Sequence, residues 1–311
     1  MNFSVTILGS GAALPTKNRM PTSQYINCNN RHFLIDCAEG TQVQLRKYKI
    51  NFQKISHIFI SHLHGDHYFG LPGLISTMNL LGREKELMIY GPKELETLIT
   101  PMLYYGGSRL GFTLTFIPIQ PNEKTTIYED EIVEVSSFPL VHKIPTCGFV
   151  IQEKAKLLKI NPEKIAPYGL KIEHFKDLQH GKDILLENGK KCSYKEVTLP
   201  AQKAMCYAYC SDTKKSIRIV DYIKEATVLY HEATFLIKHQ KRANTTTHSS
   251  TKDAAEIALK ANVGLLIAGH ISSRYKTGED HLNELQSIFA NSQVASDGMY
   301  IDLAKEQLKN V

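Results

Sequence analysis

The chain has 311 residues, of which 42% are hydrophobic, and its 37 basic and 31 acidic side chains give a formal net charge of +6. This apolar fraction supplies a sizeable core and excludes an intrinsically disordered chain, while the modest positive charge permits a polyanionic partner without requiring one. No stretch reaches the roughly 20 apolar residues of a membrane-spanning helix, and no basic segment precedes the first apolar run, so we expect a cytoplasmic protein without a membrane partner.

Strand-like and helical patterns alternate along most of the chain, which is typical of an α/β or α+β fold. Apolar runs predict strands at residues 2–8, 24–28, 32–36, 55–61, 204–210, 226–230 and 264–268. Helical periodicity predicts helices at residues 41–47, 73–81, 93–104, 251–262 and 280–290. The six cysteines form no CxxC pair and lie mostly in apolar runs, so we expect reduced core residues.

Residues 152–198 interrupt this alternation with a polar, lysine-rich segment that shows little sustained periodicity. Its ten lysines and seven acidic residues give it a net charge of 10 − 7 = +3, about half of the excess of the whole chain. We interpret it as an inserted arm, although charge alone is equally compatible with a solvated surface excursion.

The strongest chemical signal is the stretch SHLHGDH at residues 61–67, which directly follows an apolar run. It places four metal-ligand side chains in six positions: His62, His64, Asp66 and His67. A turn through Gly65 lets alternating imidazoles converge while the Asp66-His67 pair reaches a second point nearby. This pattern predicts a two-metal site, for which imidazole and carboxylate ligands favour zinc and leave manganese or iron open.

A two-metal site needs more than four ligands, and three further candidates follow apolar runs later in the chain. They are His142, Asp212 and His270. Each is more often structural when taken alone, but together with the first motif they form a set. A carboxylate at Asp212 would bridge two metals that lie about 3.5–4 Å apart in hydrolytic sites of this kind.

These residues resemble the metallo-β-lactamase superfamily, whose H-x-H-x-D-H motif is matched at residues 62–67, and within it the ribonuclease Z family. Further similar stretches are residues 35–42 (IDCAEGTQ), 231–234 (HEAT), 248–251 (HSST) and 269–275 (GHISSRY). The resemblance covers nearly all of residues 1–311, as one domain with the arm inserted at 152–198. It implies a four-layer αββα sandwich with the metals at one edge.

The resemblance also implies a function: removal of the 3′ trailer from precursor tRNA by a cut after the discriminator nucleotide, which leaves a 3′-hydroxyl on the tRNA and a 5′-phosphate on the trailer. Two zinc ions per subunit are implied, the first held by His62, His64 and His142. The second would be held by Asp66, His67 and His270, with Asp212 bridging. The arm would be an exosite that grips the tRNA body, serving the active site of the partner in a homodimer.

Three residues are candidates for catalysis. Asp66 lies next to the metals and can accept a proton from the attacking water. For the proton of the departing 3′-oxygen we choose His248, held by Glu232, as the resemblance implies. From sequence alone, we would favour Glu232 as a carboxylate at the start of a helix and His248 as a residue near a helix N-cap; the resemblance reverses that preference. Asp36 ends a strand and either accepts a proton from a ligand histidine or caps the following turn.

Basic residues near the expected site are candidate phosphate ligands, with a solvated charged loop as the alternative. Lys17 and Arg19 belong to a P-x-K-x-R sequence at residues 15–19, which resembles the family's loop at the RNA 3′ end, and Arg274 follows the last candidate ligand. The glycine pair at residues 9–11 lacks the third glycine of a dinucleotide turn, so we expect no nucleotide cofactor. A close backbone approach to the metal site is the preferred interpretation.

Two other functions compete with the tRNA 3′ endonuclease. One keeps the fold and the metals but hydrolyses small or cyclic phosphodiesters, with the arm as decoration. The other is an RNA-binding module in which zinc is a structural element. Structural zinc sites are usually closed and rich in cysteine, whereas this set offers histidine and aspartate, so we favour catalysis.

Overall fold

The computed structural model describes residues 2–107 and 109–308 of the chain. It forms two compact units, a larger one made of Met1–Gln152 and Met205–Val311 and a smaller one made of Glu153–Ala204. Within the described ranges no helix is both long and apolar enough to cross a lipid bilayer.

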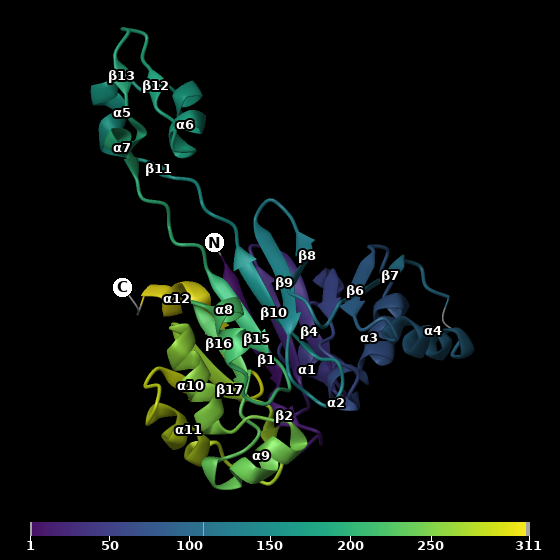
Figure 1. Cartoon of the computed structure of the whole chain (residues 1–311). Coiled ribbons are helices and arrows are strands. Elements are labelled where there is room, and N and C mark those ends of the chain that lie inside the picture. Colours follow the sequence, from purple (N-terminus) through teal and green to yellow (C-terminus); the bar gives the residue numbers. More distant parts are fainter. Residues whose placement is uncertain (1, 108, 309–311) are drawn as a thin grey trace. The chain divides into compact units, whose positions relative to one another are not determined.

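Two seven-stranded sheets form the centre of the larger unit (Figure 1). The first has the order β20 (Tyr300–Asp302), β1 (Phe3–Gly9), β3 (Ser23–Cys28), β4 (Arg31–Cys37), β5 (His57–Phe59), β6 (Leu87–Gly91) and β7 (Leu114–Pro118). The second has the order β19 (Ser292–Val294), β17 (Leu265–Gly269), β16 (Val228–Glu232), β15 (Cys206–Cys210), β10 (Cys147–Glu153), β9 (Val133–Pro139) and β8 (Thr125–Glu129). A short parallel pair, β2 (Gly11–Ala12) and β18 (Ile271–Ser272), lies apart from both sheets in the hydrogen-bond pattern.

Apolar side chains from both sheets fill the space between them. Phe149 of the second sheet contacts Phe59 of the first at a ring-centroid distance of 5.6 Å, and Tyr209 and Tyr230 stack at 5.2 Å. These rings are almost completely buried, and burying each contributes on the order of 2 kcal/mol. The inner core therefore joins the sheets face to face.

Helices cover the outer faces of the two sheets (Figure 1). The first sheet packs against the helices α1 (Thr41–Lys47), α3 (Leu71–Leu80) and α4 (Leu95–Tyr105) through a second apolar cluster. The second sheet packs against α8 (Val220–Ile223), α10 (Thr251–Ala261) and α11 (Glu279–Gln286) through a third. The remaining helices of this unit are α2 (Gly65–Tyr68), α9 (Gln240–Thr246) and α12 (Leu303–Leu308). The expectation of an αββα four-layer sandwich is confirmed.

The helix at residues 251–261 illustrates how sequence sets an element here. The hydroxyl of Ser250 accepts a hydrogen bond from the amide of Asp253, whose side chain in turn accepts one from the amide of Ser250, a capping box. The alanine-rich face of this helix is buried, and Asn262 ends the helix in the left-handed conformation that asparagine tolerates. His248 lies just before this cap.

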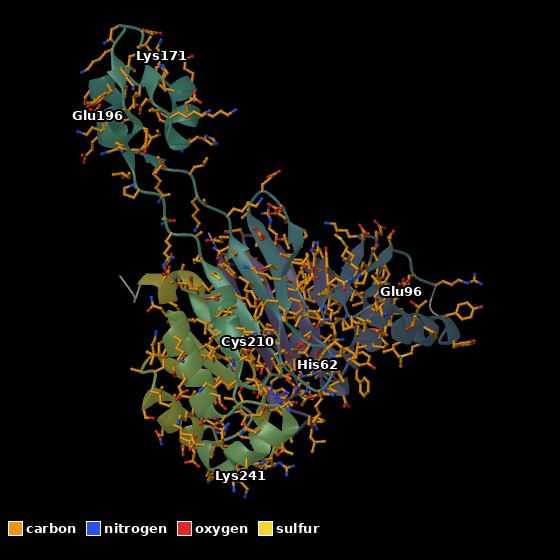
Figure 2. All side chains as sticks on the ribbon, viewed as in Figure 1. His62, Glu96, Lys171, Glu196, Cys210 and Lys241 are labelled. Carbon is orange, nitrogen blue, oxygen red and sulfur yellow. The ribbon has the colours of Figure 1, made fainter. Side chains whose placement is uncertain are left out.

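The smaller unit has more regular structure than its sequence predicted. Its helices are α5 (Pro162–Tyr168), α6 (Ile172–Gln179) and α7 (Tyr194–Val197), and its strand pairs are β11 (Lys159–Ile160) with β14 (Thr198–Leu199) and β12 (Ile184–Leu185) with β13 (Lys191–Cys192). Asn161 caps α5, and Gly169 ends it at a positive φ of 60°. Buried Leu170, Leu178 and Val197 form a small core of its own, whose short elements leave no long periodic pattern. Charged side chains such as Lys171 and Glu196 remain exposed (Figure 2).

All six cysteines are buried and free, as expected for reduced core residues.

Candidate metal centre

The seven candidate ligands follow the carboxyl ends of four strands: β5, β9, β15 and β17. Because β15, β16 and β17 pair in parallel, Asp212, Glu232 and His270 are brought to one edge of the second sheet. His270 has a positive φ of 55°, and a Cβ on the preceding Gly269 would lie 2.1 Å from the hydroxyl oxygen of Tyr230. The turn into His270 therefore requires glycine at position 269.

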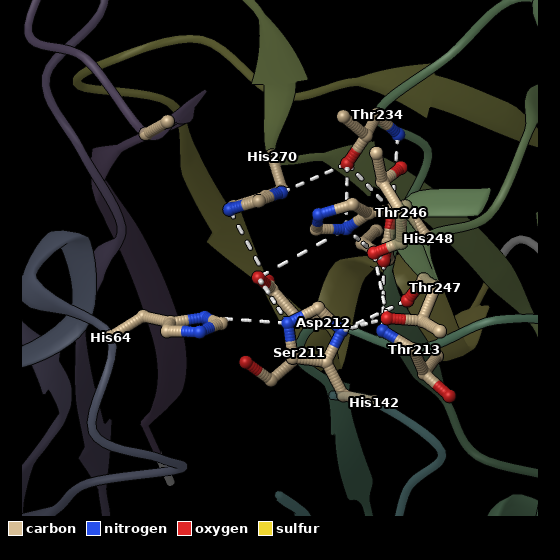
Figure 3. Close-up of polar contacts among 12 residues, drawn as sticks. His64, His142, Ser211, Asp212, Thr213, Thr234, Thr246, Thr247, His248 and His270 are labelled. Atoms are coloured by element: carbon tan, nitrogen blue, oxygen red, sulfur yellow. Dashed lines mark hydrogen bonds and ion pairs between the residues drawn. The ribbon is translucent and has the colours of Figure 1, made fainter. Parts of the chain in front are cut away.

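One group of ligand atoms comes from three histidines. His64 Nδ1 lies 3.0 Å from His62 Nε2 and 3.3 Å from His142 Nε2. Two nitrogens bound to one tetrahedral zinc at 2.0–2.1 Å lie about 3.3 Å apart, so these spacings match a common cation. Figure 3 shows His64 and His142 beside Asp212.

A second group lies on the other side of Asp212. His270 Nε2 is 3.4 Å from Asp66 Oδ2, and His67 Nε2 is 3.7 Å from the same oxygen. Asp212 faces both groups: its Oδ2 is 3.7 Å from His62 and from His142, and its Oδ1 is 3.4 Å from His67 and 3.2 Å from His270. This carboxylate therefore lies between the two groups.

Unsatisfied atoms show that this cluster fits a cation. His67 Nε2 and Asp212 Oδ1 are buried, and the described residues provide neither with a hydrogen-bond partner. Unpartnered buried polar atoms are costly, and a cation that binds both removes this cost. The donor set, imidazole with carboxylate, is compatible with a divalent metal.

Hydrogen bonds made by Nδ1, the ring nitrogen that faces away from the cluster, orient the imidazoles of His67 and His142. His67 Nδ1 lies 2.8 Å from Asp36 Oδ2, so Asp36 accepts a hydrogen bond from a candidate ligand histidine. Asp36 also accepts bonds from the Tyr209 hydroxyl and the Ser61 amide. His142 Nδ1 donates to the carbonyl of Thr247 at 2.9 Å, which leaves Nε2 facing the cluster.

The backbone of the early glycine-containing turn also approaches the site. The amide of Ala13, just after β2, donates to Asp66 Oδ2 at 2.8 Å. This is the close backbone approach expected for the glycine pair at residues 9–11. This hydrogen bond fixes the carboxylate of Asp66.

Glu232 and His248 form a pair beside the cluster. Glu232 ends β16 and is completely buried, so it does not start a helix. Its Oε1 lies 2.8 Å from His248 Nδ1 and accepts a second bond from the amide of Thr213. His248 Nδ1 also lies 4.0 Å from Asp212 Oδ2, and Ser250, not His248, caps the following helix.

Burial and charge set the pKa values in this region. Burial lowers the pKa of His62 well below its usual range. Burial also opposes charge on His67, but the carboxylates of Asp212 and Asp36 outweigh it and raise the pKa of this imidazole. Burial likewise disfavours charge on His248, yet Glu232 raises the pKa of His248 to about 9. The carboxylates therefore favour the protonated forms of His67 and His248 but not of His62.

Known proteins are similar to this chain over nearly its whole length. The chain is 41% identical to ribonuclease Z of Parabacteroides distasonis over 97% of its own length and 99% of the relative's. It is 43% identical to ribonuclease Z of Cytophaga hutchinsonii over 96% and 95% of the two chains. The chain belongs to the ribonuclease Z family. As a member of that family with a cluster fit for a divalent cation, it is an enzyme, a metal-dependent hydrolase.

Other comparisons support the fold of this ribonuclease Z family member. A crystal structure of human tRNase Z, short form, has a TM-score of 0.70 and 27% identity, covering 96% of this chain and 99% of the human one. The metallo-β-lactamase fold protein YhfI from Bacillus subtilis has a TM-score of 0.68 at 15% identity, covering 97% and 100%. A family model described as anti-Pycsar protein Apyc1 matches residues 3–167.

The structure places the candidate phosphate ligands of this family member in different settings. Lys17 is exposed and, with Arg19, lines a cavity of about 230 Å³. The guanidinium of Arg19 donates to Ser10 Oγ at 2.7 Å and to the carbonyl of Ala295 at 2.5 Å. Its Nη1 is therefore engaged in hydrogen bonds within the protein. Arg274 donates to Ser272 Oγ and lies over the ring of Phe235 at 5.1 Å.

Sequence reasoning did not single out Thr234 or Thr247. Thr234 contacts both Glu232 and His270, and Thr247 contacts His142. Thr234 belongs to the HEAT stretch, two residues after Glu232, and this position in the sequence could have indicated its contact with the site. Thr247 contacts His142 Nδ1 through its backbone carbonyl at 2.9 Å and its hydroxyl at 3.1 Å, and no motif of the sequence marks this contact.

Proposed function

We propose that this chain is a zinc-dependent endoribonuclease that removes the 3′ trailer from precursor tRNA, cutting after the discriminator nucleotide. The tRNA would end in a 3′-hydroxyl and the trailer would begin with a 5′-phosphate. The observation that carries this proposal is the position of Asp212 between two ligand groups, in a chain of the ribonuclease Z family. The names of its relatives and the similarity to human tRNase Z support tRNA as the substrate.

We assign two cations, zinc by preference and manganese as an alternative, to the two groups. His62, His64 and His142 would hold the first, and Asp66, His67 and His270 the second, with Asp212 in contact with both. When bound, such cations lower the pKa of water and neutralise charge on the phosphoryl oxygens. The side chains of the protein then orient the reactants and move protons.

Asp66 would accept a proton from the attacking water. Its carboxylate is fixed by the amide of Ala13 and lies within 3.4 Å of His270 Nε2. The water oxygen forms the new bond to phosphorus as the bond from phosphorus to the 3′-oxygen breaks. A carboxylate held in this way keeps its direction throughout the step.

His248 would give a proton to the departing 3′-oxygen. Its Nδ1 is engaged by Glu232 Oε1, so Nε2 is the ring nitrogen left to carry the donated proton. Glu232 is completely buried and fixed by further donors, so it holds the imidazole in one orientation. His248 is only 16% exposed, which shields its proton from solvent.

The smaller unit would bind the body of the tRNA. Its segment 152–198 carries a net charge of +3, and its lysines are spread over short elements that pack around their own core. Phosphate contacts from such lysines give affinity without reading sequence. Of the candidates in the larger unit, Lys17 is exposed and, like Lys276, lines the cavity beside β2, so it suits the 3′ end of the RNA.

A homodimer in the cytoplasm completes the proposal and rests on the family resemblance. Light scattering of the purified protein at micromolar concentration tests the dimer, which a monomer mass would contradict. Imaging of a tagged chain tests the location.

Incubation with a precursor tRNA, with and without a chelator, tests the function. Cleavage after the discriminator nucleotide, with the stated end groups and full inhibition by the chelator, is the expected result. Cleavage at other positions, or activity without metal, would contradict it.

A second candidate is hydrolysis of small phosphodiesters, because all seven proposed ligands belong to the larger unit. Bis(p-nitrophenyl) phosphate is the probe for this activity. A kcat/KM for it that equals or exceeds that for precursor tRNA would favour the second candidate.

A further inference from the structure

The hydroxyl of Thr234 lies between the acid pair and the candidate metal cluster. Its Oγ1 is 2.6 Å from Glu232 Oε2. It is also 2.9 Å from His270 Nδ1, and Figure 3 shows Thr234 beside His270. The residue is 3% exposed, so water does not compete for these contacts. One hydroxyl therefore contacts both a proposed second-cation ligand and the residue that holds His248.

The direction of these hydrogen bonds follows from the donors available. Oε1 of Glu232 accepts from the amide of Thr213 and from His248 Nδ1, and Oε2 accepts from the amide of Thr234. A carboxylate in this setting is ionised and accepts only, so the single hydroxyl proton of Thr234 must point at Oε2. The hydroxyl oxygen then accepts from Nδ1–H of His270.

This arrangement fixes the tautomer of His270. With the proton on Nδ1, the lone pair of Nε2 points toward Asp212 Oδ1 and Asp66 Oδ2, which lie 3.2 and 3.4 Å away. The opposite tautomer would direct an N–H at the cation position. The hydroxyl of Thr234 thus decides whether His270 presents a ligand atom.

The backbone provides a second link between the same two segments. The amide of Ala233 donates to the carbonyl of Gly269 at 2.9 Å, and the amide of Ser272 donates to the carbonyl of Thr234 at 3.3 Å. These bonds set the path of the chain around His270 but leave its side-chain torsions free. Ring orientation is therefore left to the hydroxyl and to ring contacts with His248 and His67, each at a centroid distance of 5.4 Å.

We propose that Thr234 is a positioning residue that fixes His270 as a ligand of the second cation and couples that cation to the Glu232–His248 pair. This inference rests on the proposed two-cation site. Thr234→Val keeps the shape of the side chain and removes both hydrogen bonds, leaving His270 Nδ1 without its acceptor. Thr234→Ser restores the hydroxyl.

The test is a titration of the chelator-stripped full chain with Co²⁺, whose visible absorption reports its ligands. We expect wild type to take up two equivalents, and Thr234→Val to bind the first normally and the second about 10- to 100-fold more weakly. Thr234→Ser should return both affinities to within a few-fold of wild type. With precursor tRNA, Thr234→Val should lower kcat more than it changes KM.

Thr22→Val is the matched control, because Thr22 is 1% exposed and its hydroxyl has no hydrogen-bond partner among the described residues. It should bind both Co²⁺ equivalents as wild type does. If Thr234→Val does not fold, Thr234→Ala replaces it in the same titration.

Each outcome separates this inference from the proposed function. Fewer than two equivalents bound by wild type would overturn the two-cation site itself. Two equivalents bound by wild type and equally tightly by Thr234→Val, with unchanged kcat, would overturn the role of Thr234 alone. Failure of Thr234→Ser to restore the second affinity would also contradict it.

Discussion

Asp36 Oδ2 lies 2.8 Å from Nδ1 of His67, and both side chains are completely buried. Asp36 reaches this position from the end of β4, with a φ of 53° that aspartate tolerates better than most residues. The carboxylate also accepts from Tyr209, whose ring stacks in the core between the sheets. The orientation of a proposed ligand is thus tied to the packing of the core.

Asp36→Asn should weaken cation binding. An asparagine whose amide nitrogen faces His67 cannot accept the Nδ1 proton, so the imidazole loses its fixed tautomer. We expect a 10- to 100-fold loss of Zn²⁺ affinity in a competition assay with a chromogenic chelator. Asp302→Asn, a half-buried exchange in the edge strand β20 of the first sheet, is the control. Equal Zn²⁺ affinity of Asp36→Asn and wild type would contradict this account.

Glu232→Gln and His248→Gln should slow cleavage, although the metal ligands remain in place. Loss of a general acid typically costs 10²- to 10⁴-fold in rate, and we expect a fall in kcat within that range. Zinc content, measured by mass spectrometry of dialysed protein, should remain at the wild-type value in His248→Gln, because the side chain of His248 is not a proposed ligand.

His32→Gln is the control for the acid pair, since His32 bonds Tyr25 at the start of β4. It should cleave at the wild-type rate. A His248→Gln variant with wild-type kcat would transfer the acid role to another group.

Exchange of lysines in the smaller unit tests its binding role. Lys176 of α6 and Lys195 of α7 are exposed, and Lys176→Ala/Lys195→Ala should weaken binding of precursor tRNA. The slope of log affinity against log salt should become shallower by about one for each lysine–phosphate pair that the exchange removes. Hydrolysis of bis(p-nitrophenyl) phosphate should not change.

Lys93→Ala provides the matched control, because Lys93 belongs to the larger unit and its side chain is 82% exposed. It should leave both the affinity and the salt slope as in wild type. An unchanged slope in the double variant would show that these lysines do not contact the RNA.

Much of the site could be predicted because its signals are local. The motif at 62–67 needs one strand end and one turn, and Asp212 and His270 each follow a continuous apolar run. The contacts that hold these ligands could not be predicted, because they join distant segments: the Ala13 amide to Asp66, and Thr247 to His142. Such pairs depend on how the sheets pack, which no local pattern encodes.

The same limit applies to the fold. The helix at 41–47 was predicted at the bounds it has in the structure, since its periodicity is local. The small core of the unit at Glu153–Ala204 was not foreseen, because it depends on single apolar residues such as Leu170 and Leu178 on short elements. Arg19 looks in the sequence like a free cation, and only the fold reveals its bond to Ala295.

The ion pair of Arg31 and Asp130 predicts a pH effect away from the cluster. Asp130 Oδ2 lies 2.7 Å from Arg31 Nε. Burial alone would raise the pKa of Asp130, but bonds from Arg31 and from the amides of Ile132 and Val133 lower it to about 2. Because this value is below the ordinary 3.8, the stabilisation is present above pH 3.8 and is lost as the pH falls through about 2.

Asp130→Asn should therefore reduce the free energy of unfolding by about 1 kcal/mol near pH 6, since the pair is partly exposed to solvent. The difference from wild type should shrink between pH 4 and pH 2, as measured by urea unfolding. A difference that stays constant over this range would contradict the assigned pKa.

Anomalous diffraction at the zinc edge from crystals of the zinc-loaded chain tests the central claim most directly. The account predicts two peaks on either side of Asp212, one among His62, His64 and His142 and the other among Asp66, His67 and His270. A single peak, or peaks away from Asp212, would contradict it.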